Sequence, residues 1–198
     1  MSCGKDKATV KVIGGKYKPN GHFHTIEANT PIYNESDVLM GVTNPRSLTH
    51  IHAYGGESIF FESLSKGKLL GTKCENPDCE ANGSIFIPFR IHCPDCLAKN
   101  TVVDMTEVAN KGAKVYTFMT TERTGAFNTL EKPIRFVNVE FEGVPTILMG
   151  YLSVGEPRMG MKVVPIFQTK NPTFTILDLS WVPEGTNESQ LPEGFTFG

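Results

Sequence analysis

The chain has 198 residues, of which 39% are hydrophobic and 20% are charged, as in soluble proteins that bury a core. Its formal net charge is -2, so no overall positive charge favours nucleic acid or an anionic membrane. The sequence lacks both an apolar run approaching the roughly 18 residues of a membrane helix and the apolar stretch of a signal peptide. We therefore expect a cytosolic protein whose thiols stay reduced.

Residues 1–56 are predicted to form an extension with little regular structure, because Gly, Pro and Asn turn signals punctuate them. Short apolar pieces with strand-like alternation, such as residues 9–13, lie between these turns. Such a segment buries little surface by itself, so we expect it to wrap over a partner subunit or over the following domain. Cys3, in the polar start of the extension, is interpreted as a bystander.

Four of the five histidines lie in this extension, in two His-x-His pairs. Residues i and i+2 of a strand share a face, so each pair could place two imidazoles on one metal ion. No carboxylate or third ligand follows at a fixed spacing, which favours ordinary surface or hydrogen-bonding histidines. The pairs are His22 with His24 and His50 with His52.

Residues 57–70 are predicted to form a helix that docks on the next segment or on another chain. Phe60, Phe61 and Leu64 recur at three- and four-residue spacing and would share one face. Gly56 precedes the segment, and Gly67 and Gly71 mark its end. The aromatic face is therefore expected to be a docking face.

Residues 71–100 contain two close cysteine pairs joined by a connector of thirteen residues. Cys-x4-Cys and Cys-x2-Cys turns each bring two sulfurs within reach of one ion, and four thiolates suit zinc best, with rubredoxin-like iron second. Four protein ligands leave no open position for water or substrate, so the site should be structural. The ligands are predicted to be Cys74, Cys79, Cys93 and Cys96.

Residues 101–183 are predicted to form five or six short strands with no helix among them, a pattern typical of an OB-type barrel. The predicted strands are residues 101–105, 114–121, 134–141, 146–152, 161–167 and 174–182. The long polar loop at 122–133 is a candidate binding loop. The tail, residues 184–198, is rich in glycine and proline and should be loosely ordered unless a partner holds it.

The order of helix, cysteine ribbon and barrel resembles the zinc-ribbon/OB-fold family of acyl-CoA-associated proteins. The motifs are the helix at 59–74, the stretch Pro88–Cys96 and the glycine at Gly160 before a late strand. The resemblance covers residues 57–182 and implies a non-catalytic subunit that pairs with a thiolase-like enzyme and helps to bind or enclose acyl-CoA. Two features depart from the pattern: the first cysteine pair has four intervening residues, and the extension has no counterpart.

If the resemblance holds, basic side chains should contact the phosphates of CoA. The stretch around Pro88 gives Arg90 the strongest claim, and Phe127 in the long loop could pack on an adenine or an aromatic acyl group. Each of these residues has a simpler interpretation, as a solvated surface charge or as a plug for the barrel end. The basic candidates are Arg90, Arg123, Lys132, Arg135 and Arg158.

Two other functions fit the same predicted fold. OB barrels and zinc ribbons also bind single-stranded nucleic acid, but the net charge and the lack of basic clusters interleaved with aromatic residues argue against this. An electron carrier would hold iron in the four cysteines. The sequence contains no nucleophile elbow, phosphate-binding glycine loop or zinc-protease motif, which favours a non-catalytic role.

Overall fold

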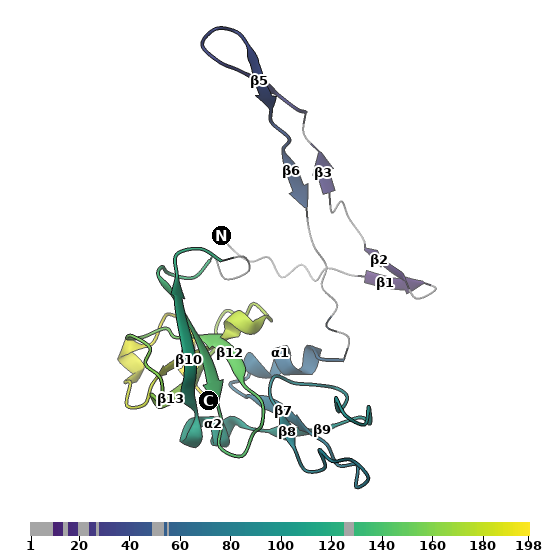
Figure 1. Ribbon diagram of the computed structural model, residues 1–198, viewed down its shortest axis with the longest axis vertical. Coiled ribbons are helices and arrows are strands. Elements are labelled where there is room, and N and C mark those ends of the chain that lie inside the picture. The colour runs from purple at the N-terminus through teal and green to yellow at the C-terminus, as the bar shows by residue number, and fades with distance from the viewer. Residues whose placement is uncertain are drawn as a thin grey trace. The chain divides into compact units, whose positions relative to one another are not determined.

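The computed structural model describes residues 10–13, 16–19, 24–26, 28–48, 54, 56–124 and 129–198. The chain divides into two compact units, Met1–Ala53 and Tyr54–Gly198. Strands predominate in both units (Figure 1), so the prediction of a mainly β protein is confirmed. None of the helices in the described part of the chain has the length and apolar character needed to cross a bilayer.

The first unit is more regular than the sequence predicted, because its described residues form three two-stranded antiparallel ladders. Of the predicted histidine pairs, His24 begins a strand, whereas His22, His50 and His52 lie outside the described residues, as does Cys3. The ladders join β1 (Val10–Ile13) to β2 (Lys16–Pro19), β3 (His24–Ile26) to β6 (Arg46–Leu48), and β4 (Pro31–Tyr33) to β5 (Leu39–Val42).

The hairpin formed by β4 and β5 is closed by an asparagine turn. Asn34 Oδ1 accepts hydrogen bonds from the backbone amides of Ser36 at 2.9 Å and Val38 at 3.0 Å. In the ladder, Tyr33 lies opposite Leu39 and Pro31 lies opposite Val42, so these four side chains share one face. All four are exposed.

Helix α1 (Ser58–Leu64) opens the second unit and is shorter than the predicted helix at 57–70. Gly67 has a φ of 72°, and the amides of Gly67 and Lys68 donate to the carbonyls of Leu64 and Ser63, both at 3.0 Å. This pair of bonds is a Schellman motif, which ends a helix. Phe60 and Leu64 are buried in the core of the unit, so part of the predicted docking face packs within the chain.

The ribbon sheet has the order β8-β7-β9. In the connector between the cysteine pairs, regular strand is limited to two residues before Pro88, which has no amide hydrogen to donate to a sheet. The sequence assigned residues 101–105 to the barrel, but this strand pairs with the ribbon instead. Asp104 lies opposite Leu70, and Thr101 lies opposite Lys73. The strands are β7 (Leu70–Lys73), β8 (Ile85–Phe86) and β9 (Thr101–Asp104).

The barrel begins after α2 (Thr106–Gly112), a helix that the sequence analysis did not predict. Two three-stranded sheets, of order β10-β11-β12 and β14-β13-β15, are joined by single bridges at Lys114–Lys162 and, in parallel, at Leu152–Trp181. These links reproduce the strand order of a partly open OB barrel. The strands are β10 (Lys114–Thr121), β11 (Ile134–Glu140), β12 (Leu148–Tyr151), β13 (Val163–Gln168), β14 (Leu179–Pro183) and β15 (Phe195–Phe197).

The tail is ordered by pairing, contrary to the prediction of a loose segment. It contains η2 (Glu188–Gln190) and ends in β15, which pairs with β13. In this ladder Phe197 lies opposite Ile166, and Phe195 lies opposite Gln168. A further short helix, η1 (Ile176–Asp178), precedes β14. The tail thus completes one of the two barrel sheets.

One apolar core runs through α1, the ribbon and the barrel. Phe60 from the helix lies 6.3 Å from Phe89 of the ribbon, measured between ring centroids. Trp181 is fully buried against β12, where a Cβ atom on Gly150 would lie 2.8 Å from the indole nitrogen. Glycine is therefore required at position 150 for the tryptophan to pack against β12.

Candidate functional site

The four predicted ligands meet at one point of the ribbon. Cys74 directly follows β7, and its amide and carbonyl are fixed by backbone hydrogen bonds with Ser84 at 3.1 Å and Gly83 at 2.8 Å. In the second turn, Cys93 donates its amide to Ala98 O at 2.9 Å and accepts from Leu97 at 3.0 Å. These bonds fix the backbone of each cysteine-bearing turn.

The sulfur geometry fits a tetrahedral metal ion. The Sγ atoms of Cys74 and Cys96 lie 3.9 Å apart, those of Cys79 and Cys93 lie 3.8 Å apart, and all four lie within 4.8 Å of one another. Zinc–sulfur bonds of about 2.3 Å in a tetrahedron place sulfurs about 3.8 Å apart. A disulfide would need about 2.05 Å between the sulfurs. The four cysteines could therefore hold one metal ion, and the ligand set is closed.

The environment shifts the pKa values of two of the four thiols in opposite directions. A hydrogen bond from the Asn76 side chain, assisted by the backbone of Ala98, lowers the pKa of Cys96 to about 6. Burial raises the pKa of Cys79 to about 12. A thiol with so high a pKa carries its proton at neutral pH, so metal binding must displace protons from this cluster.

Five of the six candidate CoA contacts lie in the described part of the chain, and four of these five are exposed. Arg90 belongs to the ribbon, where its amide bonds to Thr72 Oγ1 at 3.2 Å. Arg123 and Lys132 lie at the two ends of the barrel loop, and Phe127 lies outside the described residues. Figure 1 shows β10, which leads into this loop, well apart from the ribbon sheet of β7, β8 and β9. The assignment of these residues to CoA therefore stays a prediction.

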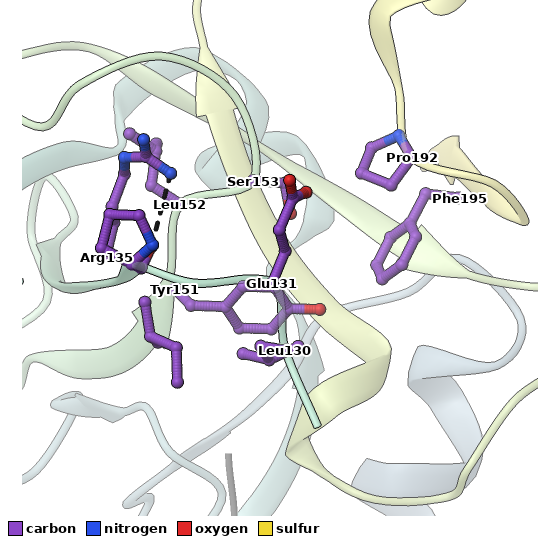
Figure 2. A pocket seen from close by; sticks show the side chains of 10 residues that line it. Leu130, Glu131, Arg135, Tyr151, Leu152, Ser153, Pro192 and Phe195 are labelled. Carbon is purple, nitrogen blue, oxygen red and sulfur yellow. Dashed lines mark hydrogen bonds between the residues drawn. The ribbon is translucent and has the colours of Figure 1, made fainter. Parts of the chain in front are cut away.

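The structure adds a pocket that the sequence analysis did not find (Figure 2). Its volume is about 150 Å³. Residues from three separated segments build it, so no local motif could have revealed it. The lining residues are Leu130, Glu131, Pro133, Ile134 and Arg135 near the start of β11, Tyr151, Leu152 and Ser153 at the end of β12, and Pro192 and Phe195 in the tail.

Arg135, a weaker sequence candidate, stands at this pocket and is paired. Its Nε and Nη2 atoms donate to Glu156 Oε1 at 3.0 and 2.7 Å. The hydrogen bond and charge of Glu156 raise the pKa of Arg135, and the guanidinium lowers the pKa of Glu156. Its Nη1 atom makes a longer contact, 3.5 Å, to Pro133 O. Arg158, the remaining candidate, is exposed and does not line the pocket.

Two lining residues at the end of β12, Tyr151 and Ser153, are fixed by hydrogen bonds to the segment around β14. The Tyr151 hydroxyl donates to Leu177 O at 2.9 Å, and burial raises the pKa of this phenol above its ordinary value. The hydroxyls of Ser153 and Ser180 share a short hydrogen bond. Tyr151 therefore stays neutral at physiological pH and serves as an apolar wall rather than as a base.

Comparison with known proteins points to one fold. No protein-family model and no curated protein matches the chain. The solved structure of the Ltp2-ChsH2(DUF35) aldolase matches with a TM-score of 0.51 and 20% identity, covering 68% of this chain and 98% of that chain. A DUF35-family protein of unknown function from Sulfolobus solfataricus has a TM-score of 0.47 and 23% identity, covering 66% and 87%. The chain thus shares the fold of the DUF35 protein in the aldolase structure.

Proposed function

We propose that the chain is a non-catalytic, zinc-binding subunit of a thiolase-type acyl-CoA complex, and that it helps to bind or enclose the acyl-CoA. The observation that carries this proposal is the closed four-cysteine centre built into the same second unit as an OB-type barrel. The chain shares its fold with the DUF35 protein of the Ltp2-ChsH2(DUF35) aldolase. A subunit that works beside a catalytic partner fits both observations.

The chemistry of the centre supports a scaffold role. Four thiolates fill the coordination of zinc and leave no position for a water or a carbonyl oxygen. The metal ligands are also core residues, because Cys74, Cys79 and Cys93 pack around Phe86. The ion would hold the two turns of the ribbon together, and the folding free energy gained in this way is about 10 kcal/mol in small zinc sites.

The partner is proposed to be a thiolase-like subunit that carries the catalytic residues. The small subunit of benzoylsuccinyl-CoA thiolase is the member of this group that we propose as a relative, with thiolytic cleavage as its reaction. In the assembly, Arg90, Arg123 and Lys132 are available at the surface for the phosphates of CoA. A reduced tetrathiolate fits the cytosol, which we propose as the location.

Co-expression tests the proposal. The chain, purified alone, should not turn over acyl-CoA thioesters; co-expressed with its thiolase-like partner, it should co-purify and be required for turnover. The matched control is the partner expressed alone under the same conditions. A partner that reaches full activity without this chain would contradict the proposal, as would turnover by this chain alone.

A further inference from the structure

The pocket of Figure 2 lies where OB barrels bind ligands. Ligands of this fold lie on its second and third strands, next to the loop that joins the first two. Here these elements are β11, β12 and the loop after β10, and each contributes to the lining. The tail closes the remaining side with Pro192 and Phe195. The pocket is therefore formed by the binding face of the barrel.

Its size and walls select an apolar group. Figure 2 shows the Tyr151 ring between Arg135 on one side and Phe195 with Pro192 on the other. Leu130 and Leu152 add aliphatic walls. A cavity of about 150 Å³ with apolar walls accepts a molecule the size of benzene, and this pocket has a volume of about 150 Å³.

Its charges disfavour an anion. Arg135 is the one cation among the lining residues, and it is already paired with Glu156 at 2.7 Å. Glu131 adds an exposed carboxylate to the lining, while the neighbouring Lys132 does not line the pocket. A carboxylate or phosphate entering here would meet a negative charge and no uncompensated positive charge. A neutral acceptor could still take a hydrogen bond from Arg135 Nη1, whose contact with Pro133 O is long at 3.5 Å.

We propose that this pocket binds the acyl end of a thioester: an uncharged apolar group of up to about benzene size, with its carbonyl oxygen accepting from Arg135 Nη1. The anionic phosphates of the same ligand stay outside, where Lys132 is exposed. This inference rests on the proposed function and deepens it, because it separates the acyl site of the subunit from its phosphate contacts.

Titration of the full-length, zinc-loaded chain followed by amide NMR tests the site. The probe is S-benzoyl-N-acetylcysteamine, a neutral thioester without phosphates, and benzoate is its charged counterpart of similar ring size. We expect the thioester to bind with a Kd of about 1 mM or tighter, with shifts centred on Leu130, Ser153 and Phe195. Benzoate should bind at least about tenfold more weakly. No binding of the thioester, or stronger binding of benzoate, overturns the proposal.

Two pairs of variants locate the binding. Leu130→Trp fills the pocket from the loop and should weaken thioester binding at least about tenfold, whereas Met159→Trp, at an exposed position outside the pocket lining, should not change it. Arg135→Leu should weaken binding of the thioester, and Arg158→Leu is its exposed control. Equal binding by the Leu130 variant would place the ligand elsewhere and overturn the proposal.

The co-expressed complex separates this inference from the proposed function. If both hold, the Leu130→Trp subunit still co-purifies with the partner, and the complex has a raised KM for aromatic thioesters. If turnover requires the subunit but KM does not change, the acyl site is wrong and the proposed function stands. If the variant loses co-purification while the wild-type chain binds no thioester, the pocket receives a partner side chain instead.

Discussion

At the scale of single residues, Asp178 fixes the loop before β14. It is fully buried, and its carboxylate accepts hydrogen bonds from the amide and hydroxyl of Thr173 at 2.7 and 2.8 Å and from the amide of Phe174 at 2.7 Å. Phe174 has a φ of 55°, an unfavourable value for a bulky side chain. The buried carboxylate therefore stabilises a strained exposed phenylalanine.

Asp178→Ala should lower the free energy of unfolding by about 3 kcal/mol, because it removes three hydrogen bonds that Thr173 and Phe174 donate to a buried carboxylate. Denaturant unfolding of the zinc-loaded chain measures this loss. Glu188→Ala, at an exposed position, is the control and should change the same free energy by less than about 0.5 kcal/mol. Equal effects of the two substitutions would show that the carboxylate does not hold the loop.

Cys93→Ser should abolish stoichiometric zinc binding, because its sulfur lies 3.8 Å from that of Cys79 inside the cluster. Serine does not supply a thiolate, and three remaining ligands open the tetrahedron. Metal analysis after dialysis measures the loss, with Cys3→Ser expected to retain one zinc per chain. Retention of a full equivalent by the Cys93 variant would mean that the ligand set is different.

At the scale of elements, β15 is the part of the tail that matters for the barrel. It pairs with β13 and brings Phe195 to the pocket. Deleting residues 192–198 should lower the free energy of unfolding by about 2 to 4 kcal/mol, from lost backbone bonds and apolar burial. It should also remove thioester binding. Denaturant unfolding and the NMR titration measure the two effects, and unchanged stability would contradict the role of the strand.

Deletion of the hairpin of β4 and β5, in the other unit, is the control for deletion of β15. The three core clusters lie entirely within residues 54–198, so replacing residues 28–44 by a short Gly-Ser linker should leave the unfolding of that unit unchanged. An isolated two-stranded hairpin is marginally stable in water. Its exposed apolar face includes Tyr33 and Leu39. That the extension covers a partner subunit or the following domain therefore stays a prediction.

At the scale of the whole molecule, the shared core connects the four-cysteine ribbon to the barrel. Ile87 and Phe89 of the ribbon belong to the same buried cluster as Trp181 of the barrel. Trp181 is the single tryptophan of the chain and is fully buried, so its fluorescence reports on the barrel. Removal of zinc by a chelator should lower the midpoint of the unfolding transition seen by this tryptophan. A tryptophan transition that is unaffected by the metal would show that the ribbon and barrel unfold independently.

The sequence by itself determined the four cysteines that could hold a metal ion and the β character of the chain. Ligand spacing and strand alternation are local properties, so Cys74, Cys79, Cys93 and Cys96 and strand β10 could be predicted from neighbouring residues. The resemblance to a zinc-ribbon/OB-fold family added the expected order of parts. Local patterns also placed most barrel strands to within a few residues.

Only the tertiary structure decided which strands pair and where a ligand could bind. Residues 101–104 are rich in β-branched residues like a barrel strand, yet they pair with β7, because the choice of a partner strand depends on long-range packing. Helix α2 was missed for a related reason: its seven residues bury only Ala109 fully, so they carry little periodic signal. The pocket joins side chains from the start of β11, the end of β12 and the tail, which become neighbours only when the strands of the two sheets assemble and β15 pairs with β13.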